Sequence, residues 1–292
     1  PVPSAPAMLL MDWLITKYPT AKRTTLRQMV EQGRVSINGQ PARTLKVPVG
    51  ETDKVQVDQR PERTGPSLSP LELIHEDEDI LVINKPAGLL TSTTPKEPRP
   101  TAIAVIRKYL ATREPRARAG VIHRLDRDAS GLLVFSKNND AYESLKQQFF
   151  KHSVERVYTA VIHGVLVPPA GRIESDLVEL PDGTVRTTRI PTKGQHAITD
   201  YQTLKTAGGI GGIGNVSLLR VTLQTGRKHQ IRTHLAQKGH PIVGDPVYGD
   251  VKDDKSRLLL AATTLSLDHP RTGQRLTFEI PLPAEIRAVI KE

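Results

Sequence analysis

The chain of 292 residues contains no cysteine. This absence excludes disulfide bonds, zinc sites built on thiolates and cysteine nucleophiles. The chain also lacks an apolar run long enough to span a membrane, and it lacks a basic amphipathic helix with a large aromatic face. A membrane surface is therefore not the expected partner.

Acidic residues are the minority among the charged side chains, with 31 Asp and Glu against 41 Lys and Arg. The net charge of +10 and the isoelectric point near 9.8 favour a polyanionic partner. Because the membrane signals are missing, we expect that partner to be a nucleic acid. We expect a cytoplasmic protein, and the start at Pro1 leaves the true amino terminus open.

A proline-rich stretch from Arg60 to Pro70 marks a boundary between two domains. It contains three prolines and a glycine and shows no apolar periodicity, which is typical of a linker. The length of the chain allows one large domain and a small one. We therefore predict a small domain over residues 8–58, a linker over residues 59–70 and a large domain over residues 71–292.

The small domain is predicted to begin with two helices. Apolar spacing predicts them over Met8–Lys17 and Thr24–Glu31, and Gly33 is placed to end the second. The alternation of Val35 and Ile37 then predicts a strand that leads into a turn at Asn38-Gly39. Further strands are predicted around the valines that continue the same period, namely Val47, Val49, Val55 and Val57.

The small domain is also strongly basic. Between Lys17 and Lys46, seven basic residues stand against the single acid Glu31. A charge run by itself indicates only a solvated surface. The strings Lys22–Val30 and Gly33–Gly39, however, resemble the alpha-L RNA-binding domain, also called the S4 type. The resemblance covers about residues 8 to 58 and implies RNA contacts from the basic residues of the two strings, Lys22, Arg23, Arg27 and Arg34.

The most informative stretch of the large domain places Asp126 between Arg124 and Arg127 on a turn. The apolar run Leu132–Phe135 follows and predicts a buried strand that anchors the turn. Opposite charge from the two arginines would hold Asp126 ionised. An isolated Arg-x-Asp-Arg pattern more often forms a surface salt bridge, so this stretch alone leaves both interpretations open.

Three other stretches of the large domain contain candidate site residues. They are Asn84–Gly88 with Lys85, the alternating strand Val154–Gly164 with Tyr158, and Thr225–Leu235 with Arg232. Two strands are predicted ahead of Lys85, over Leu71–His75 and Ile80–Asn84, and a tight turn is predicted over Gly244–Gly249. A helix predicted over Asp140–Lys151, with Asp140 as its cap, puts Tyr142, Leu145 and Phe149 on one face, which we expect to be core.

In their order along the chain, these stretches resemble the RluA-type pseudouridine synthases over about residues 71 to 285. The signature is His123–Asp126 followed by Ser130–Leu133. The resemblance implies a mixed α/β (α+β) fold with a largely antiparallel sheet, and an enzyme that isomerises uridine to pseudouridine in structured RNA. It favours large-subunit ribosomal RNA as the target and places transfer RNA second. We expect a monomer with no cofactor and no metal.

The resemblance also implies roles for individual residues. Asp126 is the catalytic carboxylate, which either attacks the sugar or starts its deprotonation, and Arg232 anchors it. Tyr158 covers the target base and takes part in proton transfer. Arg124 fills the gap that the base leaves when it turns out of the RNA. The other residues expected to bind substrate are Lys85, Arg127, Arg227, His229 and Ile231.

Several other motifs carry weaker signals. Gly209–Gly214 has the glycine spacing of a dinucleotide site, but no helix follows it, so we expect a hairpin loop. Ser130 could complete a hydrolytic triad with His123 and Asp126, but no nucleophile-elbow sequence surrounds it. His229 and His234 lack a metal-binding spacing, which favours structural roles. The remaining alternative is a non-catalytic RNA-binding or ribosome-assembly protein on the same scaffold, and the presence of Asp126 argues against it.

Overall fold

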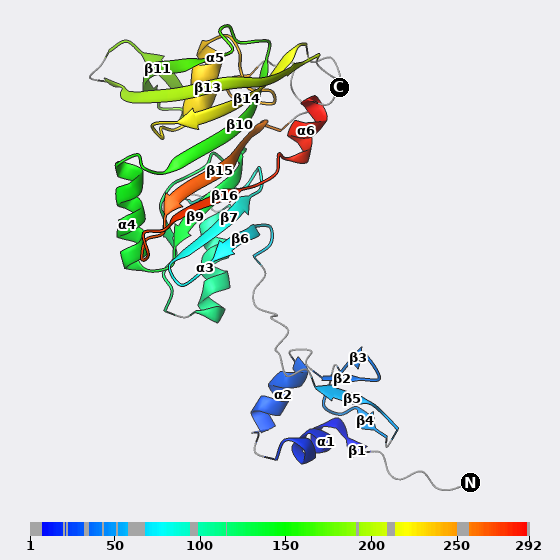
Figure 1. Ribbon diagram of the computed structural model, residues 1–292. Coiled ribbons are helices and arrows are strands. Elements are labelled where there is room, and N and C mark those ends of the chain that lie inside the picture. The colour runs from blue at the N-terminus through cyan, green and yellow to red at the C-terminus, as the bar shows by residue number, and fades with distance from the viewer. Residues whose placement is uncertain are drawn as a thin grey trace. The chain divides into compact units, whose positions relative to one another are not determined.

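The computed structural model describes residues 8–19, 21, 23–31, 35–42, 44–50, 52–57, 68–93, 99–114, 116–190, 193–208, 214–249 and 257–290. The chain divides into two compact units, Pro1–Ser67 and Leu68–Glu292 (Figure 1). Most of the predicted linker, residues 59–67, lies outside the described residues. No helix in the described part of the chain is long and apolar enough to cross a membrane.

The small unit packs two helices against short strands. Helices α1 (Leu10–Lys17) and α2 (Arg23–Glu31) precede a three-stranded antiparallel sheet in the order β3-β2-β5. Its strands are β2 (Val35–Ile37), β3 (Gln40–Pro41) and β5 (Val55–Val57), and a separate pair joins β1 (Met8–Leu9) to β4 (Pro48–Val49). Residues Met8 and Leu9, predicted as helix, are therefore strand, because they pair with β4.

The β2–β3 turn has the backbone that its sequence predicts. Asn38 and Gly39 both have positive φ, 53° and 81°, as a two-residue hairpin turn requires. The helices bury Leu10, Leu14 and Leu26 against this sheet. Among the residues expected to contact RNA, Arg23 and Arg27 are exposed on α2, while Lys22 and Arg34 lie outside the described residues, as does Gly33.

The large unit is built on one mostly antiparallel sheet in the order β12-β11-β13-β14-β10-β15-β9-β7-β6 (Figure 1). The strands are β6 (Glu72–Glu76), β7 (Ile80–Lys85), β8 (Gly120–Val121), β9 (Ser130–Ser136), β10 (Glu155–His163), β11 (Ala170–Glu179), β12 (Val185–Thr188), β13 (Gln195–Ala207), β14 (Val216–Leu223), β15 (Leu260–Asp268) and β16 (Arg275–Glu279). Two further strands lie off this path: β16 pairs with β15, and β8 pairs with β9. The predicted mixed α/β fold with a largely antiparallel sheet is confirmed.

Strand β9 lies inside this sheet, between β15 and β7, and is buried along its whole length. Leu133 and Phe135 enter one hydrophobic core with α3 (Ala102–Arg113), while Leu132 and Val134 enter a second core with Leu145 of α4 (Asn139–Phe150). A strand covered on both faces needs apolar residues at successive positions. This explains the unbroken apolar run, which anchors the turn before it as predicted.

A glycine allows the two halves of the sheet to meet. Gly131 of β9 pairs with Lys85 on one side and in parallel with Ala262 of β15 on the other. Its φ is +116°, and a Cβ there would lie 2.2 Å from the Ala262 carbonyl oxygen. Only glycine fits this close approach.

Two further helices cover the other half of the sheet. Helix α5 (Gln230–Gln237) packs on β11, β12 and β13, and α6 (Ala284–Ile290) packs on β13 and β14. Strands β13 and β14, which flank Gly209–Gly214, pair antiparallel as a hairpin requires, although residues 209–213 lie outside the described set. Helix α4 begins one residue earlier than predicted, because Asn138 and not Asp140 caps it, with the Asn138 side chain accepting from the Ala141 amide.

Candidate active site

Asp126 lies on the loop between β8 and β9, and backbone contacts on both sides hold this loop in place. The hydroxyl of Thr91 accepts from the Leu125 amide at 3.1 Å and donates to the Leu125 carbonyl at 3.0 Å. On the other side, the Arg127 carbonyl accepts from the Gly88 amide at 2.9 Å. Since both neighbours of Asp126 are fixed to the rest of the fold, its carboxylate is held in position without a bound ligand.

Lys85 also holds this loop in place, through hydrogen bonds from its side chain. It is fully buried, and its Nζ donates to the carbonyl oxygens of Pro86, Leu89 and Arg127 at 2.8, 2.7 and 3.0 Å. Burial lowers the pKa of Lys85 to about 8, against the opposing charges of Asp128 and Asp126. Lys85 was expected to bind substrate, but it does not line the cleft described below. Its ammonium group ties the Pro86–Leu89 turn to the Asp126 loop.

The Asp126 carboxylate faces Arg232 of α5. Arg232 Nη1 donates to Asp126 Oδ2 at 3.0 Å, and its Nε and Nη2 donate to the two oxygens of Asp245, each at 2.8 Å. The side chains of Arg232 and Asp245 are 3% and 0% exposed, whereas that of Asp126 is 23% exposed. One guanidinium group therefore binds the buried carboxylate of Asp245 with one edge and the cleft carboxylate of Asp126 with Nη1.

Asp245 completes this ion-pair chain and was not predicted as a site residue. Its Oδ1 also accepts from the amides of Val247 and Tyr248. Burial acts to raise the pKa of Asp245, but the hydrogen bonds and charge of Arg232 outweigh it and lower the pKa. The two carboxylates likewise outweigh burial and raise the pKa of Arg232. The sequence put Asp245 in the turn predicted over Gly244–Gly249, but it contained no signal that this carboxylate pairs with Arg232.

His229 lies on the same wall as Arg232. Its Nδ1 is 2.8 Å from Tyr248 Oη, and its Nε2 is 4.0 Å from Asp126 Oδ2. Tyr248 Oη also accepts from the Val185 amide, so strand β12 fixes the pair. Burial, opposed by the Asp126 charge, lowers the pKa of His229, which favours a neutral imidazole beside the carboxylate.

These groups border a cleft of about 780 Å³. This volume lies in the range of pockets that take small molecules, about 300–1,000 Å³. The cleft brings together seven of the nine predicted catalytic and substrate-binding residues from three separate stretches, namely Arg124, Asp126, Tyr158, Arg227, His229, Ile231 and Arg232. It lies on the large unit alone.

Arg127 does not hold Asp126, contrary to the sequence expectation. Its guanidinium group pairs with the next residue, Asp128, at 2.9 and 3.1 Å, and it does not line the cleft. The side chain is 45% exposed, so this is a surface ion pair. Arg124 is exposed and does line the cleft. The described residue that donates to the Asp126 carboxylate is Arg232.

Tyr158 forms part of the opposite wall, on β10. It is 6% exposed and lies between Val221 of β14 and Ala262 of β15 in the sheet. Burial, with the Asp126 charge acting in the same direction and Arg156 opposing it, raises the pKa of Tyr158. The phenol is therefore protonated at neutral pH.

His123 and Ser130, the residues considered for a hydrolytic triad, make hydrogen bonds to other parts of the fold. His123 Nε2 accepts from the Val134 amide at 3.2 Å, and burial, with the Arg156 charge as a smaller contribution, lowers the pKa of His123 to about 3. Ser130 Oγ accepts from Arg257 at 3.3 Å. Neither group is placed to activate the other, so the geometry does not build a hydrolytic triad around Asp126.

His234 predicts a pH dependence of stability. It is fully buried, with its ring nitrogens 2.9 Å from Thr199 Oγ1 and 3.0 Å from Ser175 Oγ, and burial lowers its pKa to about 4. Between that pH and the unfolded value near 6.5, the unfolded chain binds more protons than the folded one. The free energy of unfolding should therefore fall as pH drops across this window, by up to about 3 kcal/mol from this residue.

Denaturation of wild type and His234→Gln at about pH 7.5 and about pH 5 tests this dependence. The variant has no imidazole to protonate, so its free energy of unfolding should fall less between the two conditions. Parallel losses in the two proteins would contradict the assignment, whatever the variant's absolute stability.

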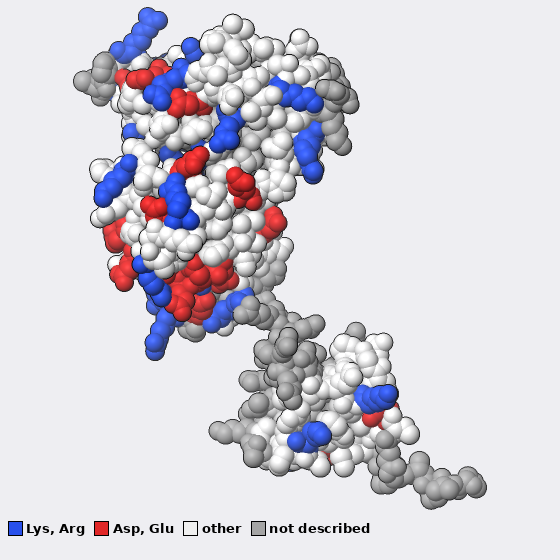
Figure 2. Space-filling model, in the orientation of Figure 1, with Lys and Arg blue, Asp and Glu red and all other residues white. Residues whose placement is uncertain are grey.

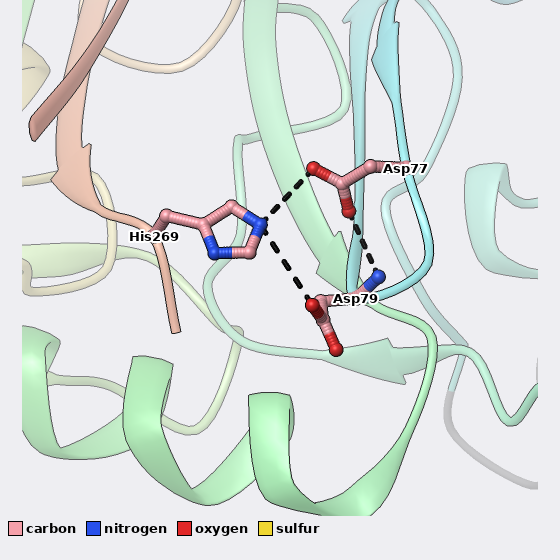
Figure 3. Close-up of side chains that lie close together, drawn as sticks. All are labelled: Asp77, Asp79 and His269. Atoms are coloured by element: carbon pink, nitrogen blue, oxygen red, sulfur yellow. Dashed lines mark hydrogen bonds and ion pairs between the residues drawn. The ribbon is translucent and has the colours of Figure 1, made fainter. Parts of the chain in front are cut away.

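The described residues include one group of side chains with the spacing of a metal site, outside the cleft. Figure 3 shows Asp77 and Asp79 of the β6–β7 turn facing His269, with ligand atoms that all lie within 4.8 Å. His269 Nε2 is 3.2 Å from Asp77 Oδ2, and Arg271 Nε is 2.8 Å from Asp79 Oδ2. Since these acids already have cationic or amide partners, the cluster serves to join the β6–β7 turn to the β15–β16 turn.

Charge is distributed unevenly over the large unit. Figure 2 shows acidic side chains gathered at the end formed by α3, β6 and β7, where the turn Glu76–Asp79 and Glu114 lie. The cleft is lined instead by six Lys and Arg residues against Asp126 and Glu179, namely Arg124, Lys146, Arg156, Arg227, Lys228 and Arg232. A polyanion is attracted to the cleft and repelled from the acidic end.

Comparison with protein families supports both units. A family model described as RNA pseudouridylate synthase matches residues 79–237, which is more than half of the chain. A second model, described as S4 domain, matches residues 10–55. Every residue that the cleft takes from the loop of Asp126, from β10 and from α5 lies inside the first match.

Related proteins match this chain over nearly its whole length. An uncharacterized RNA pseudouridine synthase of Bacillus subtilis is 35% identical over 92% of this chain and 88% of its own length. One from Chloroflexus aurantiacus is 37% identical over 99% and 91%. The ribosomal large subunit pseudouridine synthase D of Haemophilus ducreyi is 32% identical over 94% and 87%.

Solved structures share the fold of the large unit. Human RNA Pseudouridylate Synthase Domain Containing 1 matches with a TM-score of 0.59 and 26% identity, over 74% of this chain and 84% of that one. Human RNA Pseudouridylate Synthase Domain Containing 4 matches with a TM-score of 0.62 and 24% identity, over 74% and 90%.

Proposed function

This chain belongs to the RNA pseudouridylate synthase family, and on that premise we propose that Asp126 is its catalytic carboxylate and that its substrate is large-subunit ribosomal RNA. The reaction breaks the bond from C1′ of ribose to N1 of uracil and joins C1′ to C5 of the same base. The C5 hydrogen leaves as a proton, and N1 gains one. The observation that carries the assignment of Asp126 is its position, 3.0 Å from the buried Arg232 at the cleft.

The geometry suits a carboxylate that acts on the sugar. Arg232 orients one oxygen of Asp126, while the 23% exposure of the side chain leaves access from the cleft. Asp126 either attacks C1′ or removes a sugar proton, and in both cases a fixed guanidinium group limits the freedom of the carboxylate before reaction. A base inside a duplex cannot reach such a group. The target nucleotide must therefore turn out of the RNA, at a cost of about a few kcal/mol.

The walls of the cleft would hold the detached base. Tyr158, Ile231 and Leu260 supply apolar surface near Asp126, and all three are buried. Such surface excludes water while the base rotates between the two bonds. Arg124, exposed at the edge of the cleft, is placed to occupy the gap left in the RNA.

Tyr158→Phe tests proton transfer at the base separately from packing. The substitution keeps the ring and removes the phenol, so we expect kcat to fall about 100-fold or more with little change in KM. Release of tritium from RNA labelled at C5 of uridine measures both constants. Tyr201→Phe is the matched control, because Tyr201 is also a buried strand tyrosine, and its hydroxyl donates to the Pro168 carbonyl away from the cleft. Full activity of Tyr158→Phe would restrict this tyrosine to packing.

The proposed RNA class rests on the relatives named as large-subunit enzymes and on the S4 domain. Incubation of the protein with C5-tritiated large-subunit ribosomal RNA and, separately, with tritiated transfer RNA compares the two candidates. Tritium release from the first at the higher kcat/KM supports the proposal, and mapping of the new pseudouridines identifies the positions. Preference for transfer RNA would overturn the substrate. Binding without release from either RNA would instead favour a non-catalytic RNA-binding protein.

A further inference from the structure

The carboxyl-terminal end of α4 borders the cleft on the side away from Arg232 and carries an unusual exposed aromatic ring. Phe150 lines the cleft and is 84% exposed. Among the Phe, Tyr and Trp side chains of the described residues, it is the only one that is exposed. Its neighbour Phe149, which we expected to be core, packs partly on the core and stacks on the His123 ring at 4.6 Å. Phe149 is therefore occupied, while the Phe150 ring faces solvent at the cleft.

The backbone after Phe150 is fixed. Helix α4 ends with the Ser153 amide donating to the Gln148 carbonyl at 3.0 Å and the His152 amide donating to that of Phe149 at 3.3 Å. This pair of bonds is the Schellman motif, in which glycine usually takes the left-handed position. Here His152 takes it, with φ of 57°, and His152 also lines the cleft. Phe150 thus stands on a rigid helix end.

A buried cation without an anionic partner lies behind these rings. Arg156 lines the cleft and is 8% exposed, and its Nε is buried with no hydrogen-bond partner. Its contacts are neutral: Nη2 donates to the Thr225 carbonyl at 3.4 Å, and Cζ lies 5.5 Å from the centre of the Phe149 ring. A buried charge is costly unless an opposite charge meets it. Arg156 is therefore placed to receive an anion.

The Arg156 guanidinium group packs closely against Gly226, where only a glycine leaves enough room for it. A Cβ on Gly226 would lie 2.6 Å from Arg156 Nη1, so any larger residue would displace the guanidinium group. Among the other cations of the cleft, Arg232 is held by two carboxylates and Lys228 pairs with Glu179 at 2.5 Å. Within the described ranges, no carboxylate partner is found for Lys146 or Arg156, nor for Arg124 or Arg227. The α4 side of the cleft thus carries two unneutralised cations, Lys146 and Arg156.

We propose that the α4 end of the cleft is a subsite for an unpaired nucleotide next to the target uridine, whose base stacks on Phe150 and whose phosphate binds Arg156. The occupant follows from chemistry: an exposed ring beside an unpaired guanidinium matches the face of a base joined to a phosphodiester. The subsite rests on the proposed function, since it uses the RNA that the Asp126 cleft would bind. It would restrict the enzyme to uridines with an unstacked neighbour.

Binding of a fluorescein-labelled single-stranded oligouridylate, measured by anisotropy at several salt concentrations, tests the two contacts separately. Phe150→Ala should raise Kd about tenfold and leave the salt dependence unchanged, because stacking releases no counterion. Phe150→Tyr should restore binding. Arg156→Met should weaken binding and reduce the slope of log K against log salt by about 0.7, the value for one phosphate on a single strand. Val167→Ala, at an apolar position 86% exposed and outside the cleft, should bind like wild type.

The same variants are then compared on C5-tritiated ribosomal RNA. Phe150→Ala should raise KM by a factor close to its effect on Kd, with a smaller change in kcat. The subsite is overturned if Phe150→Ala binds oligouridylate as tightly as Val167→Ala, or if its main effect is a change in sedimentation, which would make Phe150 a contact between protein copies. Phe150 is so exposed that its variants should fold, so this result decides the proposal even if Arg156→Met does not fold. Absence of tritium release by wild type would instead refute the proposed function and leave the binding comparison valid.

Discussion

Replacing Asp126 by asparagine is expected to reduce tritium release from C5-labelled RNA by at least about a thousand-fold, because removal of a catalytic group that forms or breaks the reacting bonds costs rates of this order. Asparagine keeps the shape and can still accept a hydrogen bond from Arg232, but it has neither the charge nor the basicity of the carboxylate. RNA binding should change little, since Asp126 opposes a polyanion electrostatically. Single-turnover tritium release with saturating enzyme measures the chemical step.

Asp128→Asn is the matched control for this experiment. Asp128 lies on the same loop, two residues away, but it pairs with the exposed Arg127 and does not line the cleft. Its amide variant should keep most of the wild-type rate. Equal losses in the two variants would mean that the loop needs its charges for structure. Equal activity in Asp126→Asn and wild type would remove Asp126 from the chemistry.

Replacing Arg232 by methionine is expected to destabilise the protein by about 3–5 kcal/mol, because it leaves the fully buried Asp245 without its charge partner. The variant should also lose activity, since Asp126 loses the donor that orients it. Burial would then raise the pKa of Asp245 instead of Arg232 lowering it. The loss of stability should therefore shrink as pH falls from the raised pKa of Asp245 in the variant toward about 4, and further below that pH as the wild type loses its own ion pair.

Urea denaturation of three variants separates burial from charge pairing. Arg172→Met removes a bidentate pair of similar geometry, with Asp200 at 2.7 and 3.0 Å, but those side chains are 54% and 30% exposed. It should cost at most about 1 kcal/mol. Arg232→Met combined with Asp245→Asn should recover part of the stability lost in the single variant, without recovering activity. A loss for Arg232→Met no larger than for Arg172→Met would refute the view that this ion pair is a buried structural element.

Local sequence patterns predicted many of the elements, but not helices α3, α5 and α6 or strands β11, β12 and β16. The Asn38-Gly39 pair specifies a tight hairpin turn by its backbone preferences, and the apolar run in β9 specifies a strand covered on both faces. The errors lie at element ends, where a local rule met a competing contact. Met8 and Leu9 have helical spacing but pair with β4, and Asn138 caps α4 ahead of Asp140 because either residue type can do so.

The charge partners in the site show where sequence reasoning stops. Asp126 has arginines on both sides in the chain, yet Arg127 turns to Asp128, and Arg232, 106 residues away, donates to the carboxylate. The backbone conformation of a loop sets the directions in which neighbouring side chains point, and residue types alone do not specify that conformation. Lys85 is a similar case, because its polar head is satisfied by three carbonyl groups that only the packed loops bring together.

By itself, the sequence determined the family and predicted many of the elements and the residues proposed to carry out the chemistry, because these depend on residue types and spacings along one chain. The tertiary structure decided which charges pair and which stay open: Asp245 neutralises one edge of Arg232, while Arg156 has no carboxylate partner in the described part of the protein and Phe150 is exposed at the cleft. The reason is physical. Pairing and burial are set by distances across the sheet, and a one-dimensional pattern contains no information about those distances until the strands are in register.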